Sequence, residues 1–486
     1  MLVAGVDSST QSTKVLLCEA ADGTVVDQAS APHPGGTECP PQAWREALAR
    51  AGEDLLLRAA AAGVAGQQHG MVVLDENAEV IRPALLWNDL RSAAAAAELV
   101  KERGPRWWAE RTGSVPNASF TVTKLRWLAE HEPDHAARVY RVMLPHDYLT
   151  WGLLAGPPMA EEPVTDRGDA SGTGYFSPAD GAWLPEVAAD ALGHQVALPR
   201  VARPAEAVGE TAWGAVVSAG TGDNMAAALG LGLAPGEIAV SVGTSGTAYT
   251  VTTVPSADPS GAIAGFADAT GAFLPLVCTI NAGLVLDSVA AILATNIGGL
   301  SARALAAAPG ADGITLLPYF DGERTPVRPG ATGVLHGLTT RNATPENMAR
   351  AAVEAVLASL ADVAGLLHHD GTEPERVLLI GGGARSEAVR AAAPGIFGVP
   401  VDVPEPAEYV ALGAARQAAW ALAGTPDPPA WPRRPAQRYE GPAQPGIRER
   451  FAALRDATTG WDGRLPGVTT AESRAQATDQ EGTGEP

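Results

Sequence analysis

The sequence predicts an α/β protein of two related domains with a catalytic cleft between them. Two observations support this class. The chain has 486 residues, which is more than one ordinary domain holds. A strand–turn–strand pattern also occurs twice, in residues 3–17 and again in residues 238–249.

The repeated turn is of a kind that binds phosphate. Each copy is an apolar strand, a tight turn of small and hydroxyl residues, and a returning strand. Such a turn presents backbone N–H groups and hydroxyls to a phosphate chain. Either copy alone fits an ordinary β-hairpin. Only the first carries an acid, Asp7, which aligns with Ser241 of the second. The pair therefore indicates a duplicated scaffold that holds nucleotide and metal between its halves.

The first half alternates between strand and helix patterns. Strand patterns cover 1–29 and 64–81, and helical patterns cover 44–62, 92–103 and 123–131. Residues 155–209 are rich in Gly, Pro and Ala, and we expect irregular connections with short helices there. A glycine turn within 218–233 then opens a helix. Ala-Pro-Gly-Glu at 234–237 breaks the chain, so we predict domains at 1–234 and 235–466.

The second half contains the clearest helix, which Thr344 caps and Pro345 begins. Apolar residues from Val353 to Leu366 recur at three- and four-residue spacing, which predicts one buried stripe. A buried strand at 377–380 follows. Residues 467–486 are rich in Thr, Glu, Gln and Gly, and we expect them to be disordered.

The composition limits the partners. The chain has 55 Asp and Glu against 34 Lys and Arg, and its charge of −21 disfavours nucleic acid and anionic membranes. The three cysteines Cys18, Cys39 and Cys278 form no disulfide framework or zinc spacing, which fits a reducing cytoplasm. Because the first residues lack a basic leader and a small-residue cleavage site, we expect no secretory segment. Polar residues interrupt the most apolar stretch, 273–294, so we expect a buried strand and helix there.

Asp223 is the leading candidate for catalysis. It stands between glycines and an Ala-rich helix, which places its carboxylate at a helix start facing open space. The commonest role of such an aspartate is to cap the helix. The same carboxylate could accept the proton of a substrate hydroxyl that attacks a phosphorus atom.

Three further polar motifs follow strand patterns. Gln68 and His69 could bond to sugar hydroxyls, and Trp87-Asn88 offers the aromatic and amide groups of a carbohydrate site. Each also fits a structural role, as a polar loop or as a buried Trp beside a capping Asn. The glycine-rich segment 381–386 lets the backbone approach a base or ribose closely. It lacks the GxGxxG spacing of a dinucleotide fold.

Eight motifs in order, within residues 1–424, resemble the FGGY family of carbohydrate kinases. They are GVDSSTQSTK, GQQHGMVVLDENAEVIRPALLWND, LPHDYL, TDRGDASGTGYF, AGTGDN, SVGTSG, LPYFDGERTP and LIGGGARS. The resemblance implies the family's fold, two actin-like (ribonuclease H-like) ATPase domains with an interdomain catalytic cleft. GQQHG, LLWND and TDRGDASGT are most similar to the motifs of members that act on xylulose.

The resemblance also implies roles for single residues. Asp223 corresponds to the catalytic base and Asp7 to the carboxylate that positions Mg²⁺. The implied sugar contacts are Gln68, His69, Trp87, Asn88 and Asn224. The implied phosphate and adenosine contacts are Thr10, Ser12, Lys14, Thr244, Gly381, Gly382, Gly383 and Ser386. Gln68 stands where bacterial relatives commonly have Met, which puts the sugar preference in question.

The expected protein is an ATP- and Mg²⁺-dependent cytoplasmic kinase that phosphorylates D-xylulose at its 5-hydroxyl, with a homodimer left open. The sugar and the phosphate turn with its Mg²⁺ would lie on the first domain and adenosine on the second. The alternatives are a kinase for ribulose or another ketose or polyol, a sugar-binding regulator that has lost catalysis, and an Hsp70-like chaperone ATPase. The joint presence of Asp7, Asp223 and Thr244 disfavours the regulator. The chaperone is disfavoured because no β-rich peptide-binding region follows the second half.

Overall fold

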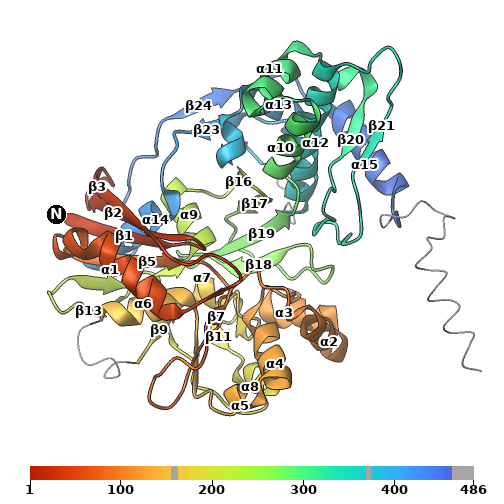
Figure 1. Cartoon of the computed structure of the whole chain (residues 1–486). Coiled ribbons are helices and arrows are strands. Elements are labelled where there is room, and N and C mark those ends of the chain that lie inside the picture. The colour runs from red at the N-terminus through yellow and green to blue at the C-terminus, as the bar shows by residue number, and fades with distance from the viewer. Residues whose placement is uncertain (155–161, 368–373, 462–486) are drawn as a thin grey trace, which may run out of the picture.

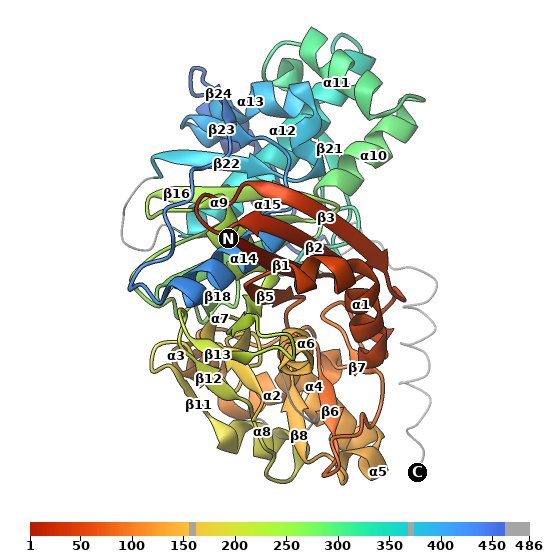
Figure 2. The same cartoon turned by 90° about the vertical axis from the view of Figure 1, so that its left-hand side faces the viewer.

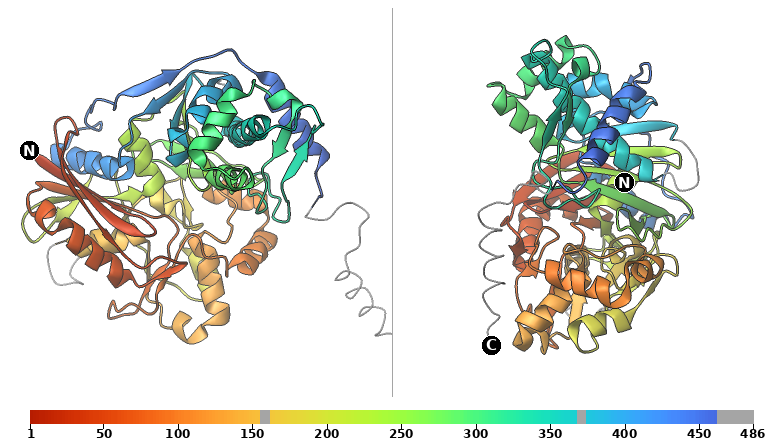
Figure 3. Two further views of the ribbon diagram at one scale, coloured as in Figure 1. Left: turned by 45° about the horizontal axis from the view of Figure 1, so that its top comes forward. Right: turned by 90° about the vertical axis from the view of Figure 1, so that its right-hand side faces the viewer.

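The computed structural model describes residues 1–154, 162–367 and 374–461. The segment 467–486, predicted to be disordered, lies outside the described residues. Two seven-stranded sheets dominate the described part, one in each half of the chain (Figure 1). Figure 2 and Figure 3 show the second domain on one side of the first sheet and a helical lobe of the first domain on the other.

The first sheet has the strand order β13-β14-β5-β1-β2-β3, with the short β15 beside β5. Its strands are β1 (Leu2–Ser8), β2 (Ser12–Glu19), β3 (Val25–Pro32), β5 (Ala61–Gly66), β13 (Ala207–Glu210), β14 (Val216–Ser218) and β15 (Thr221–Gly222). β1 and β2 are antiparallel with Asp7 opposite Lys14, and β5 runs parallel to β1. The ends of β1, β5 and β15 therefore meet at one edge of the sheet.

The second sheet repeats this plan, with the order β18-β19-β17-β16-β22-β23-β24. Its strands are β16 (Glu237–Val242), β17 (Gly246–Thr250), β18 (Ala264–Ala267), β19 (Phe273–Thr279), β22 (Arg376–Ile380), β23 (Val401–Pro404) and β24 (Ala436–Tyr439). β16 pairs antiparallel with β17 and parallel with β22, as β1 pairs with β2 and β5. Ser241 lies opposite Thr247, as Asp7 lies opposite Lys14. The predicted duplication is confirmed.

Helices pack around both sheets. Those from the first half are α1 (Pro41–Leu57), α2 (Ala93–Arg103), α3 (Pro105–Thr112), α4 (Thr121–His131), α5 (Pro133–Ala136), α6 (Pro145–Leu153), α7 (Arg167–Ala170), α8 (Pro185–Leu192) and α9 (Asp223–Leu231). Those from the second half are α10 (Gly283–Ile292), α11 (Ile297–Ala306), α12 (Pro345–Ala364), α13 (Glu387–Phe397), α14 (Tyr409–Ala423) and α15 (Pro445–Ala457). The helix predicted to begin at Pro345 is α12. The Thr344 Oγ1 accepts the N–H of Asn347 at 3.2 Å, so the predicted cap is present.

Short strand pairs complete the lobe and the second domain. They are β4 (Glu38–Cys39) with β7 (Ala84–Leu85), β6 (Val72–Leu74) with β8 (Arg141–Met143), β9 (Val164–Asp166) with β12 (Arg200–Ala202), β10 (Phe176–Ser177) with β11 (Ala182–Trp183), and β20 (Thr315–Leu317) with β21 (Val334–His336). The apolar stretch 273–294 forms β19 and α10, as predicted. In the described part of the chain, no helix by itself has the length and apolarity to cross a membrane. Helices α10 and α11 have that length and apolarity only when they are taken together, and the pair is bent by 84°.

Helix α14 crosses the predicted domain boundary at residue 234: it follows that boundary in the sequence but packs in the first domain. It belongs to the second half by sequence, but it packs on β1, β5 and α9 of the first (Figure 1). Glycines make this contact close: a Cβ on Gly413 would lie 1.8 Å from the Ala226 carbonyl oxygen, and one on Gly5 would lie 1.9 Å from that of Ala411. The predicted second domain, 235–466, thus includes a helix that is packed in the first.

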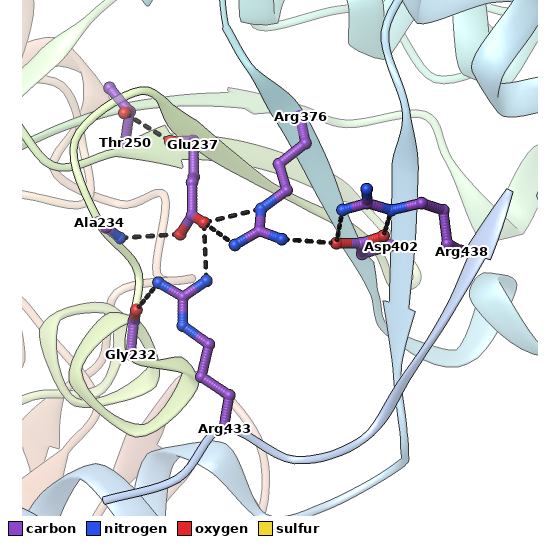
Figure 4. A network of polar contacts seen from close by, with 8 residues as sticks. All are labelled: Gly232, Ala234, Glu237, Thr250, Arg376, Asp402, Arg433 and Arg438. Atoms are coloured by element: carbon purple, nitrogen blue, oxygen red, sulfur yellow. Dashed lines mark hydrogen bonds and ion pairs between the residues drawn. The ribbon is translucent and has the colours of Figure 1, made fainter. Parts of the chain in front are cut away.

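A charged network ties together two of the connections between the domains, from α9 to β16 and from α14 to β24 (Figure 4). Arg433, in the connection from α14 to β24, donates to Glu237 at 2.7 Å and to the Gly232 carbonyl at 2.6 Å. Glu237, at the start of β16, also accepts the Nε–H of Arg376 at 2.8 Å. Arg376 bonds in turn to Asp402, to which Arg438 also donates. Since Glu237 is buried, it is the common anchor of both connections.

Replacing Glu237 with glutamine is expected to lower the free energy of unfolding by about 2–3 kcal/mol, because two guanidiniums lose a buried carboxylate. Burial by itself raises the pKa of Glu237, but bonds from Arg433, Ala234 and Arg376 outweigh it and lower the pKa. A carboxyl with a lowered folded-state pKa adds stability above its unfolded pKa, and that stability is lost as the pH falls through the folded value. Urea unfolding at pH 7 and at stepwise lower pH should show the gap between the wild type and the variant closing in acid.

The control is Glu102→Gln, which breaks an exposed pair with Arg126. That change should cost no more than about 1 kcal/mol. Equal losses in the two variants would contradict a special role for Glu237.

Candidate active site

A cleft of about 820 Å³ lies between the two sheets and is lined by both halves of the chain. The first half contributes Asp7, Lys14, Asp223 and Asn224. The second half contributes Ser241, Thr247, Gly381, Gly382, Arg385 and Glu408, among others. The fold therefore places the predicted base and the predicted metal carboxylate together, although 216 positions separate Asp7 from Asp223 in the sequence.

Asp223 is the first residue of α9 and follows β15, whose two residues pair with the end of β5. The N-cap is Gly222 and no side chain caps the helix, so Asp223 does not fill the capping role that was its alternative. Its Oδ1 accepts the backbone N–H of Asn224 at 2.8 Å and the Asn224 side-chain amide at 2.9 Å. Burial, with the negative charges of Asp7 and Asp169, raises the pKa of Asp223 to about 7. A carboxyl with that pKa is suited to accept a proton near neutral pH.

Gln68 and Asp223 are linked through the side-chain amide of Asn224. The Asn224 Nδ2 donates both to Asp223 and to Gln68 Oε1, the latter at 2.9 Å. Gln68 is 3% exposed, and its Nε2 has no hydrogen-bond partner among the described residues. An unpaired buried donor is costly, so this amide is available to a ligand oxygen.

His69 is held as a neutral imidazole. Its backbone has a φ of 68°, and its Nδ1–H donates to the Gly172 carbonyl at 2.6 Å. Burial lowers its pKa to about 3. Because Nδ1 carries the proton, Nε2 is an acceptor. The ring lies between Phe120 at 4.8 Å and Phe266 at 5.8 Å, measured between ring centroids. The sequence analysis missed Gly172 and Phe266; no local motif joins residues so far apart.

Trp87 and Asn88 flank the first phosphate turn rather than the cleft wall. The indole of Trp87 is 40% exposed, and its N–H donates to Thr10 Oγ1 at 3.1 Å. The Asn88 side-chain amide donates to the Gly36 carbonyl at 3.1 Å. The structure thus ties Trp87 to a residue of the predicted phosphate loop and gives Asn88 a loop-bracing bond.

The first turn combines a bare carboxylate with a paired lysine. Asp7 is 5% exposed, and its Oδ1 has no hydrogen-bond partner in the described part of the chain. Burial raises its pKa to about 6, although Lys14 acts in the opposite direction. Lys14 Nζ contacts Glu408 at 2.6 Å. A buried carboxylate oxygen without a donor, beside a turn suited to phosphate, fits a divalent cation. Glu408 was not anticipated, since 394 positions separate it from its partner.

The turn itself is closed by Ser9, whose N–H and hydroxyl both donate to the Ser12 carbonyl at 3.0 Å. In the second turn Thr244 is exposed, and the Gly243 carbonyl accepts the N–H of Gly283 at 2.8 Å, so the turn abuts the start of α10. Each turn keeps hydroxyl groups at its surface, as a phosphate site requires.

The glycine segment has two faces. Gly381 has a φ of 89°, and both it and Gly382 line the cleft. A Cβ on Gly383 would lie 2.3 Å from Val242 Cγ1, so this glycine allows close packing on β16. Ser386 is buried, its hydroxyl lies 3.2 Å from that of Ser301, and it is not among the residues that line the cleft.

Comparisons with known proteins agree on one family. The N-terminal domain model of the FGGY family of carbohydrate kinases matches residues 2–230, and the C-terminal domain model matches residues 238–422. The xylulose kinase of Streptomyces coelicolor is 49% identical over 441 residues, which cover 87% of this chain and 88% of that protein. That of Streptomyces rubiginosus is 47% identical over 480 residues, or 94% of each.

Solved structures show the same fold. The crystal structure of xylulose kinase from Bifidobacterium adolescentis matches with a TM-score of 0.88 and 41% identity, and covers 94% of this chain and 99% of that one. The Plasmodium falciparum glycerol kinase with ADP matches with a TM-score of 0.82 at 17% identity, covers 94% of this chain and 97% of that one, and supports the fold alone.

Proposed function

This chain belongs to the FGGY family of carbohydrate kinases, and from that premise we propose that it transfers the γ-phosphoryl group of ATP to the 5-hydroxyl of D-xylulose. The observation that carries the proposal is the cluster at the base of the cleft, where Asn224 bonds to both Asp223 and Gln68. It joins a carboxylate that can accept a proton to an amide that can bind a hydroxyl. The similarity to proteins named xylulose kinase supports the choice of sugar.

The proposed sugar site uses one donor and one acceptor. Gln68 Nε2, a buried amide without a partner, would donate to a sugar oxygen. His69 Nε2, left unprotonated because Nδ1–H is held by Gly172, would accept a sugar hydroxyl. Leaving these polar atoms unpaired is costly, so a sugar that lacks the matching groups is rejected.

In the proposed reaction Asp223 takes the proton of the attacking hydroxyl as the phosphoryl group transfers in line. Lys14 leaves Glu408 to contact the nucleotide phosphates, while Thr10, Ser12 and Thr244 donate hydroxyls to them. Asp7 would hold Mg²⁺, which when bound neutralises charge on the phosphates. Most of the rate enhancement comes from positioning and charge stabilisation.

We assign the sugar, Mg²⁺ and phosphate side to residues 1–234 and the adenosine side, at Gly381 and Gly382, to residues 235–466. A cytoplasmic location is part of the proposal. Because the two phosphate turns lie on different domains, closure of the cleft would exclude water and limit ATP hydrolysis.

An ADP-release assay with MgATP tests the proposal. It compares D-xylulose, L-xylulose, D-ribulose, L-ribulose, glycerol, D-gluconate and no sugar. The highest kcat/KM with D-xylulose supports it. Preference for another ketose would keep the base but change the assigned sugar. ATP binding without turnover on any acceptor would favour a sugar-binding regulator.

The pH dependence should report the base. Asp223 acts only when ionised, so kcat/KM for the sugar should fall about tenfold per pH unit below pH 7, where its pKa of about 7 lies. The kcat profile should break at a lower pH, because bound Mg²⁺ brings positive charge close to Asp223. Both profiles are measured over two pH units on either side of 7. A kcat/KM that stays flat through this range would contradict the assignment.

A further inference from the structure

Beneath the cluster at the base of the cleft lies a buried group of one histidine and three aspartates. His146, Asp147, Asp166 and Asp169 are all at most 2% exposed. They come from the motifs LPHDYL and TDRGDASGT, to which the sequence assigned no chemistry. Charged groups are rarely withdrawn from water in this way unless they are paired and fixed.

His146 is held as an imidazolium. Its Nδ1–H donates to Asp169 Oδ2 at 2.6 Å, and Nε2 faces the Ala219 carbonyl at 3.3 Å. Both neighbours only accept, so both nitrogens carry a proton. Burial lowers the pKa of His146, but Asp147, Asp169 and Asp166 outweigh it and raise the pKa to about 10. Both ring nitrogens therefore face acceptors, and the imidazolium offsets part of the negative charge of the three carboxylates.

One branch of this network reaches β15, the strand directly before Asp223. Asp166 accepts the backbone N–H groups of Gly168 at 2.8 Å and Asp169 at 2.9 Å, which fixes the start of α7. It also accepts the hydroxyl of Thr221 at 2.8 Å. Thr221 is buried and stands two residues before Asp223. The bond therefore holds β15 against α7.

A second branch reaches His69. The turn that follows α7 carries Gly172, whose carbonyl fixes the His69 tautomer. The His146 side chain also packs between two glycines: a Cβ on Gly66 would lie 2.9 Å from His146 Cβ, and one on Gly220 would lie 2.7 Å from His146 Cδ2. Gly66 ends the strand before Gln68, and Gly220 precedes β15. His146 thus packs against both backbone segments that carry the proposed sugar and base residues, with its Cβ and backbone at Gly66 and its ring at Gly220.

We propose a positioning network formed by His146, Asp169, Asp166 and Thr221. It holds the Asp223 carboxylate and the His69 imidazole in a fixed position relative to each other. These residues act through Asp223 and His69. The inference rests on the proposed function for the reaction it serves. The restraint that the network places on residues 220–224 can be tested without any substrate.

Thr221→Val is the sharpest test, because replacing His146 would leave buried carboxylates without their cation and threaten folding. Valine keeps the shape of threonine and removes the bond to Asp166. We expect kcat to fall about tenfold, since small misplacement of a reacting group is costly. KM for MgATP should stay unchanged, and amide hydrogen exchange should accelerate at residues 220–224. Thr221→Ser, which restores a hydroxyl, should recover kcat.

Thr211→Val is the matched control. Thr211 is also buried, and its hydroxyl accepts the N–H of Ala215 in the turn between β13 and β14, at the sheet edge. This variant should lose comparable thermal stability but keep kcat. Wild-type kcat in Thr221→Val, an equal loss in Thr211→Val, or no recovery in Thr221→Ser would overturn the proposal.

Failure of the proposed function gives a different pattern. If the wild type prefers another acceptor, the same variants are measured with that acceptor. If no acceptor is turned over, amide hydrogen exchange alone tests whether the network is present. Faster exchange confined to 220–224 in Thr221→Val supports the network, and unchanged exchange overturns it.

Discussion

Asp223→Ala is expected to lower kcat by about 10³-fold or more, because proton acceptance worth about 10²–10⁴-fold and orientation of the attacking hydroxyl are lost together. Asp223→Asn, which keeps the shape but cannot accept the proton, should lose nearly as much. The KM for MgATP should change little, since the carboxylate acts on the acceptor. Coupled ADP release under saturating substrates measures kcat, and an equilibrium titration with nucleotide verifies that binding survives.

The matched control for this prediction is Asp287→Asn, which changes an exposed aspartate on α10. It should leave kcat at the wild-type value. Near-normal kcat in Asp223→Ala would contradict the proposed mechanism, whereas loss of kcat in both variants would point to a general defect in folding.

Asp7→Asn should separate activity from stability. We expect kcat to fall about 10²-fold, because a carboxylate that holds Mg²⁺ is replaced by a neutral amide. Folding stability should rise instead. Burial raises the pKa of Asp7 from 3.8 to about 6, so ionising this group costs more in the folded protein than in the unfolded chain. That cost is fully present above pH 6 and absent below the unfolded value, and removing it should add up to about 3 kcal/mol at neutral pH.

Thermal unfolding without ligands and steady-state assays with varied Mg²⁺ measure the two effects. Asp27→Asn is the control, because Asp27 lies on β3 of the same sheet but is exposed and paired with Arg58. It should alter neither kcat nor the apparent need for Mg²⁺, and it should not raise the melting temperature. A less stable Asp7→Asn would mean that the carboxylate is paired in the free protein.

Local patterns predicted much of this structure because they depend on neighbours in the sequence. The two hairpins, the helix that begins at Pro345 and the strand and helix within 273–294 follow from alternation, helical spacing and turn residues. The motifs also pointed to Asp7, Asp223, Gln68 and Asn224, which the fold then brings together at one cleft edge. Chain order alone placed α14 with the second half. Its packing on β1 depends on Gly5, which faces Ala411, and its packing on α9 depends on Gly413, which faces Ala226; both pairs meet only in three dimensions.

By itself, then, the sequence determined the duplicated α/β class, the family resemblance and the residue types that we propose for the phosphate and sugar sites. Only the tertiary structure decided which groups are bare and which are paired. Among the described residues it left Asp7 Oδ1 and Gln68 Nε2 without partners, set Glu408 against Lys14, and fixed the His69 tautomer through Gly172. The physical reason is that pKa and hydrogen-bond availability depend on burial and on neighbours that are more than a hundred residues away in sequence.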